Sequence, residues 1–132
     1  MTYLLDTNIC IYIIKKKPKN VKDHFSSLHV GDVAISTITQ SELQYGVEKS
    51  SNPEKNQAAL DQFLLPLAIL EYDQKAAREY GKIRSALEKK GQPIGPLDML
   101  IAAHAKSLNL VVVTNNEKEF SKVSGLLTEN CV

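Results

Sequence analysis

Short apolar runs alternate with longer helical patterns along the whole of this 132-residue chain. Strand-like runs lie at 3–5, 33–35, 67–70 and 110–113, and a helix-sized stretch separates each from the next. Parallel strands need connections of this length, so the alternation favours a mostly parallel sheet covered by helices on both faces. We therefore predict an α/β fold in a single domain that spans residues 1–132.

Capping residues and apolar spacing predict seven helices between and after these strands. They lie at 9–17, 21 to about 29, 37–48, 53–64, 73–90, 97–107 and 117–123. The helix at 97–107 is apolar almost all round, which is typical of a buried helix. His104 lies on it, and we interpret it as a core histidine with hydrogen-bond partners rather than a catalytic base.

Composition excludes several classes of protein. The chain is 43% hydrophobic with only 6 Gly and 5 Pro, so it can bury a core and is not disordered. Its apolar runs are far shorter than the ~20 residues that span a bilayer, and the first residues lack a signal-peptide pattern, so we expect a cytoplasmic protein. Two cysteines, Cys10 and Cys131, are too few for a disulfide framework.

Acidic and amide side chains follow the predicted strands. Asp6 comes directly after the first strand, Glu42 lies in the helix after the second, Asp98 begins the buried helix, and Asn116 and Glu119 follow the last strand. In parallel sheets these positions meet at one edge, where ligands bind. Carboxylates gathered there repel one another unless a cation intervenes, and Mg²⁺ or Mn²⁺ prefers oxygen ligands.

Each of these residues also has an ordinary structural interpretation. Asp6 and Asn116 are good helix caps, Glu42 and Glu119 suit solvent-exposed helix positions, and Asp98 would interact favourably with a helix dipole. The combination is more specific than any member of it. Phosphate-binding loops, dinucleotide fingerprints, nucleophile elbows and His-Glu-x-x-His motifs are all missing from the sequence, which disfavours kinases, oxidoreductases, serine hydrolases and zincins.

Four segments together resemble one known family. They are L-D-T-N at 5–8, S-T-I-T-Q-S-E-L-Q-Y-G at 36–46, P-I-G-P-L-D-M-L-I-A-A-H-A at 93–105, and V-T-N-N-E-K-E-F at 113–120. In this order they are similar to the PIN-domain ribonuclease toxins called VapC. The resemblance implies a three-layer α/β/α sandwich and an endoribonuclease that uses Mg²⁺ or Mn²⁺.

The resemblance also assigns roles to residues. Asp6, Glu42 and Asp98 match the family's acidic triad, and either Asn116 or Glu119 matches its less uniform fourth position. Asp6 and Asp98 are expected to bind the metal directly, with Glu42 and the fourth residue completing the site. The last two segments look most like members that cut initiator tRNA in its anticodon stem-loop. The family further implies a VapB antitoxin, a toxin homodimer and larger toxin–antitoxin complexes.

The net charge of +1 means that RNA binding must depend on local clusters of basic residues. Lys15, Lys16 and Lys17 form one cluster, and Arg84 with its neighbours another, although such stretches are often only solvated surface. Two alternative functions stay open. One is a phospho-receiver domain, with Thr114 at a strand end, and the other is a catalytically inactive PIN-like binding domain.

Overall fold

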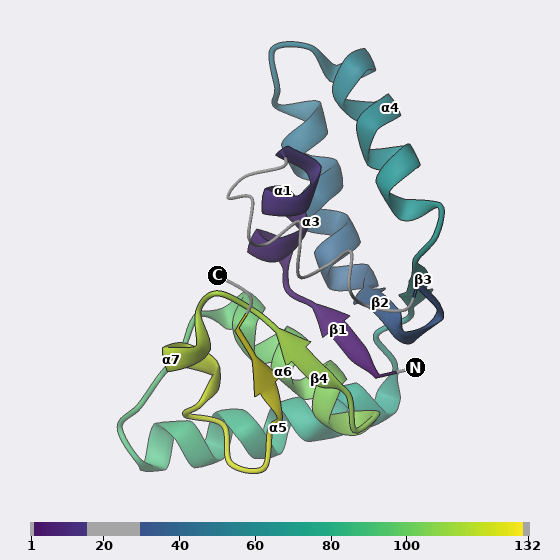
Figure 1. The fold of residues 1–132 in the computed structure, drawn as a ribbon. Coiled ribbons are helices and arrows are strands. Elements are labelled where there is room, and N and C mark those ends of the chain that lie inside the picture. The colour runs from purple at the N-terminus through teal and green to yellow at the C-terminus, as the bar shows by residue number, and fades with distance from the viewer. Residues whose placement is uncertain (1, 16–29, 131–132) are drawn as a thin grey trace.

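The computed structural model describes residues 2–15 and 30–130, and its centre is one parallel sheet (Figure 1). The strands are β1 (Tyr3–Leu5), β2 (Val33–Ser36), β3 (Ala68–Leu70), β4 (Val111–Val113) and β5 (Thr128–Glu129). They lie in the order β3-β2-β1-β4-β5, and every neighbouring pair is parallel. The four predicted strands are confirmed to within one residue, whereas β5 is too short to show a pattern in the sequence.

Helices connect the strands as predicted. Their bounds are α1 (Thr7–Lys15), η1 (Val30–Asp32, a 3₁₀ turn), α3 (Thr37–Glu48), α4 (Pro53–Leu64), α5 (Gln74–Lys89), α6 (Pro96–Ser107) and α7 (Glu117–Phe120). The helix predicted at 21–29 lies outside the described residues. The prediction of a last helix to 123 was wrong by three residues, because the chain turns back towards β5 through Gly125, whose φ of +79° favours glycine.

Side-chain caps set where three of these helices begin. Ser36, Asn52 and Asp73 each accept a backbone N–H from the first turn of α3, α4 and α5 respectively. Pro53 occupies the first turn of α4, where its missing N–H costs nothing. At the other end of α5, Gly91 adopts a φ of +66° and ends the helix.

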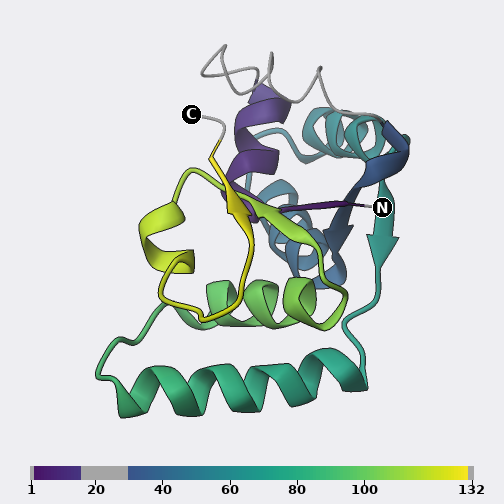
Figure 2. The ribbon, with the colours of Figure 1, turned by 60° about the horizontal axis from the view of Figure 1, so that its bottom comes forward.

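Strand side chains alternate between two cores, one on each face of the sheet. Leu4, Ala34 and Val112 pack with α5 and α6 on one face. Their neighbours Leu5 and Val113 pack with α1, α3 and α4 on the other. Figure 2 shows α6 against the sheet and α5 beyond it. The fold is therefore the predicted three-layer α/β/α sandwich.

Helix α6 is as buried as its sequence predicts. Half of its residues are buried, including Ile101, Ala102 and Ala105. His104 is buried as well, with Nδ1 2.8 Å from Ser36 Oγ, while Nε2 has no partner of standard geometry in the described part of the chain. Within residues 2–15 and 30–130, no helix is long and apolar enough to cross a membrane.

Candidate active site

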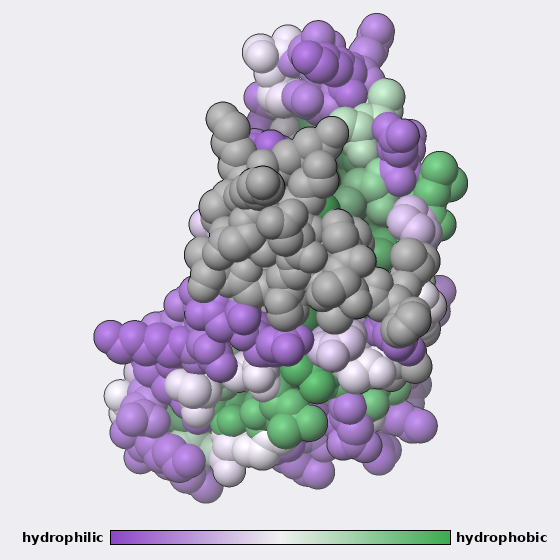
Figure 3. Space-filling model, viewed as in Figure 1, coloured by the Kyte–Doolittle hydropathy of each residue, from purple (hydrophilic) through white to green (hydrophobic). Residues whose placement is uncertain are grey.

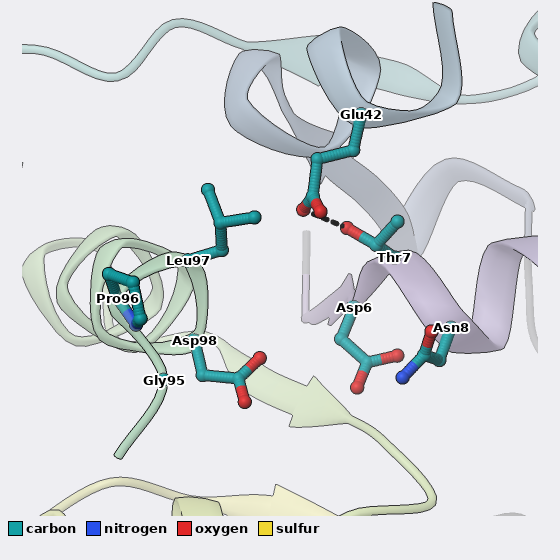
Figure 4. A pocket seen from close by; sticks show the side chains of 8 residues that line it. All are labelled: Asp6, Thr7, Asn8, Glu42, Gly95, Pro96, Leu97 and Asp98. Atoms are coloured by element: carbon teal, nitrogen blue, oxygen red, sulfur yellow. Dashed lines mark hydrogen bonds between the residues drawn. The ribbon is translucent and has the colours of Figure 1, made fainter. Parts of the chain in front are cut away.

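Three of the predicted acidic residues line one pocket beyond the carboxyl end of β1 (Figure 4). The pocket has a volume of about 260 Å³, and Asp6 reaches it from the junction of β1 and α1, Glu42 from α3 and Asp98 from α6. Asp98 extends towards Asp6 across it, and the carboxylate of Glu42 lies beside Thr7. The remaining lining residues are Thr7, Asn8, Gly95, Pro96 and Leu97.

Asp6 is the most buried acid of the site, with only 3% of its surface exposed. Its Oδ1 accepts the Ile9 backbone N–H at 2.8 Å, so the predicted capping role is confirmed. Its Oδ2 accepts the Thr114 hydroxyl at 2.5 Å. Both oxygens therefore have a partner and still face the pocket.

Burial is the main influence on the charge of Asp6. Desolvation raises the pKa of its carboxyl to about 6, against the lowering effect of the hydrogen bonds from Thr114 and Ile9. The negative charges of Asp98 and Glu42 are smaller contributions to this raised pKa. Asp6 is thus mostly ionised at pH 7 and readily protonated below pH 6.

Glu42 is half-buried and faces the pocket, so the interpretation of it as a solvent-exposed helix residue was wrong. The Thr7 hydroxyl, 3.3 Å from Thr39 Oγ1, donates to Glu42 Oε1 at 2.7 Å. This bond joins the first turn of α1 to α3 and fixes the direction of the Glu42 carboxylate.

Asp98 lies in the first turn of α6, next to the loop that enters the helix at Pro96. Burial raises the pKa of its carboxyl, and the charges of Glu119 and Glu42 raise it further. The helix dipole acts in the opposite direction but does not outweigh burial and repulsion.

The two candidates for the fourth position have different surroundings. Glu119, on α7, is close enough to raise the pKa of Asp98, and its Oε1 lies 3.3 Å from Lys122 Nζ. Asn116 occupies the N-cap of α7, but its side chain makes no capping hydrogen bond, and its backbone N–H donates to Thr114 Oγ1 at 2.8 Å. Neither residue lines the pocket.

The donor set fits a hard divalent cation by its chemistry. The pocket presents carboxylate oxygens, without sulfur and without histidine, as Mg²⁺ and Mn²⁺ prefer. Among the residues that the structure describes, no three acidic, histidine or cysteine side chains converge into a ready-made ligand set. Facing carboxylates repel one another, so their separation is the arrangement expected before a cation draws them together.

Of the predicted RNA-binding residues that the structure describes, neither Lys15 nor Arg84 lines this pocket. Lys15 ends α1 and Arg84 lies on α5, and these two helices pack on opposite faces of the sheet. Arg84 contacts Tyr80 and Glu88 on its own helix. Lys16 and Lys17 lie outside the described residues. Sequence reasoning did not single out Thr7, although a hydroxyl beside Asp6 was a visible signal. Thr114 was considered only for a receiver domain, whereas it binds Asp6.

Comparison with known proteins first defines the class. The PIN-domain family model matches residues 3–126, nearly the whole chain. A curated relative, the tRNA(fMet)-specific endonuclease VapC of Shigella flexneri, is 47% identical over 130 residues, covering 98% of each protein. Ribonuclease VapC2 of Rickettsia felis is 47% identical over 131 residues, again covering 98% of each.

Solved structures agree with these sequence matches. A matching chain from the crystal structure of DNA-bound VapBC of Salmonella typhimurium gives a TM-score of 0.94 at 45% identity, with coverage of 100% of this chain and 99% of that one. VapBC2 of Rickettsia felis, bound to a promoter DNA fragment, gives a TM-score of 0.91 at 45% identity and 98% coverage of both chains. The chain therefore belongs to the VapC ribonuclease toxins of the PIN-domain family.

Proposed function

We propose that this protein is a divalent-metal-dependent endoribonuclease that cleaves initiator tRNA in its anticodon stem-loop. One observation carries the proposal. Asp6, Glu42 and Asp98 are distant in sequence, yet they face one pocket at the sheet edge where α/β proteins bind ligands. The names of the Shigella flexneri and Salmonella typhimurium relatives supply the tRNA substrate.

Asp6 and Asp98 are the residues that would hold Mg²⁺ or Mn²⁺, with Glu42 and either Glu119 or Asn116 completing the site. When bound, the cation supplies positive charge at the attacked phosphate and makes water a usable nucleophile near neutral pH. Hydrolysis of this kind, as in the rest of the family, leaves 5′-phosphate and 3′-hydroxyl ends.

The protein's own residues prepare the site for this chemistry. Thr114 and the Ile9 N–H hold the Asp6 carboxylate in one orientation, and Thr7 does the same for Glu42. The two aspartates are partly desolvated, which strengthens their attraction for a cation. Glu42 Oε1 accepts a hydrogen bond from the Thr7 hydroxyl, which leaves the second oxygen of the carboxylate to orient water.

Partners follow from the same relatives. Their toxin chains were solved as VapBC complexes, some of them bound to DNA. We extend this to the present chain, with a VapB-type antitoxin as its inhibitor, a toxin homodimer, and larger complexes built from both. With tRNA as its substrate, the enzyme would act in the bacterial cytoplasm.

The direct test is cleavage of total bacterial RNA by antitoxin-free protein in Mg²⁺, with new 5′-phosphate ends mapped by sequencing. Asp98→Asn and EDTA should abolish cleavage. Asp61→Asn, an exposed acid of α4, removes the same charge outside the pocket and should cut like the wild type. Discrete cuts in initiator tRNA support the proposal.

Three other results would contradict it in different ways. Cuts that persist in EDTA refute the metal dependence, and cuts confined to another RNA refute the substrate. Folded protein that cuts nothing favours an inactive PIN-like binding domain or, if Asp6 accepts phosphate from a small phosphodonor, a receiver domain.

A further inference from the structure

A second pocket, lined by lysines, lies on the face of the sheet that carries α5 and α6. Its volume is about 200 Å³, and Lys82, Lys90, Lys106 and Lys122 line it together with Ile83, Ala86, Leu87, Val123 and Ser124. Four of its nine lining residues are therefore basic and none is acidic. Figure 3 shows the hydrophilic side chains that gather over α5 and α7 in the lower part of the molecule.

The four lysines come from three segments that only the fold brings together. Lys82 and Lys90 belong to α5 and its C-cap, Lys106 to α6, and Lys122 to the turn after α7. Buried Ile83, Leu87 and Val123 form an apolar floor beneath them. A concave site with an apolar floor and converging ammonium groups suits an anion attached to a larger molecule.

Lys82 and Lys122 form ion pairs with Glu79 and Glu119, whereas Lys90 and Lys106 have no ion pair among the described residues. Lys106 Nζ donates to the Ser124 carbonyl at 2.8 Å, which neutralises no charge. Lys82 lies 3.8 Å from Glu79 and is largely exposed, so that pair is weak. Each ammonium carries three N–H donors, and one contact therefore leaves two for a ligand.

The lysine pocket shares no lining residue with the acidic pocket but is linked to it through α6 and α7. Lys122 pairs with Glu119, and the charge of Glu119 reaches Asp98. Along α6, Asp98 and Lys106 are eight residues apart, which is about 12 Å of helix axis. A bound RNA strand would therefore span the distance between the two pockets with a few nucleotides.

An acidic active site creates a problem for a polyanionic substrate. Carboxylates repel the RNA backbone, and the net charge of +1 provides no global attraction. Binding must therefore come from local cations beside the site, each of which releases counterions from the RNA. The described lysines that converge in a concave site next to Glu119 meet this requirement.

We propose that the lysine pocket is a subsite for an RNA backbone phosphate, a few nucleotides from the bond that is cut. The inference rests on the proposed ribonuclease function and adds the way in which the substrate is held. The phosphate oxygens accept hydrogen bonds from the lysine ammonium groups, and the ribose packs on the apolar floor. An acidic segment of a partner protein is the competing occupant.

The test uses Lys82→Gln/Lys90→Gln, because these two side chains are exposed and make no contact that the fold requires. Lys55→Gln/Lys75→Gln removes the same charge from exposed positions on α4 and at the start of α5. Binding to initiator tRNA is measured by fluorescence anisotropy between 50 and 300 mM salt, in the Asp98→Asn background. Cleavage rates are measured with Asp98 intact.

We expect the pocket variant to weaken tRNA binding on the order of tenfold at low salt, with a salt slope reduced by about 1 to 2. Its kcat should equal that of the wild type, because neither lysine touches the acidic pocket. The control pair should change binding by less than about twofold.

Equal weakening by both pairs would show an effect of net charge only and overturn the inference. Unchanged tRNA binding together with lost binding of a purified VapB-type antitoxin would assign the pocket to a protein partner instead. A wild-type protein that cleaves no RNA refutes the proposed function itself, and this result is distinct from active enzyme with an irrelevant pocket.

Discussion

Replacing Asp6 by asparagine should stabilise the metal-free protein at neutral pH. Burial raises the pKa of Asp6 from 3.8 to about 6. Between these values the folded state binds more protons than the unfolded state, so the free energy of unfolding falls as the pH rises. A difference of about 2 pKa units is worth about 3 kcal/mol at pH 7. Asparagine has no charge to desolvate and still accepts the Ile9 N–H.

The measurement is urea unfolding of EDTA-treated protein at pH 4 to 7. At pH 7 the asparagine variant should exceed the wild type by about 3 kcal/mol, or roughly 10 °C in Tm. Near pH 4 the carboxyl is protonated in the folded state, and the gap should shrink below about 1 kcal/mol. Asp61→Asn is the matched control and should follow the wild type at every pH, since Asp61 is exposed.

Divalent cation should reverse the order of stability. A cation that binds only the folded wild type adds about 4.1 kcal/mol at a concentration 1,000 times its Kd, which exceeds the deficit of about 3 kcal/mol. The asparagine variant should gain much less, because it lacks a charged ligand. Identical pH profiles for wild type and variant would refute the burial argument. A wild-type Tm that millimolar Mn²⁺ leaves unchanged would refute the metal site.

Three further changes test other contacts. Thr114→Val removes the hydroxyl that donates to Asp6, so the pKa of Asp6 should rise above about 6. The acid limb of the plot of kcat/KM against pH should then move to higher pH, and an unmoved limb contradicts this. Burial lowers the pKa of His104, so acidification below pH 6.5 should lower the free energy of unfolding. In the Asp6→Asn background, His104→Gln should remove this loss of stability, as measured by urea unfolding at pH 5 to 7. Phe120 is fully buried, so Phe120→Ala should cost about 3–5 kcal/mol by the same assay, and a loss under 1 kcal/mol would refute its place in the core.

The elements of the fold were largely predictable because their signals are local. A β-branched run such as Val111–Val113 and a cap such as Asp73 act over a few residues, whatever the rest of the chain does. Strand β5 escaped prediction because two residues carry no period. Its place in the sheet depends on pairing with β4, which no local pattern specifies.

The candidate site was predictable in its residue types but not in its geometry. The order of strands and the parallel-sheet rule indicated that Asp6, Glu42 and Asp98 share an edge. They did not show that Glu42 turns inwards, because its direction depends on the hydroxyl of Thr7, 35 residues away. The lysine pocket was equally hidden, since its members come from three separate segments.

By itself, then, the sequence determined the alternating elements, the helix caps and the acids that follow the strands, all of which result from interactions between near neighbours. Only the tertiary structure decided how deeply Asp6 is buried, which hydroxyl holds it and which charges it faces. Thr114, its partner, is 108 residues away along the chain. Desolvation and electrostatic repulsion act through space, so the charge state of the site depends on the packing that brings these residues together.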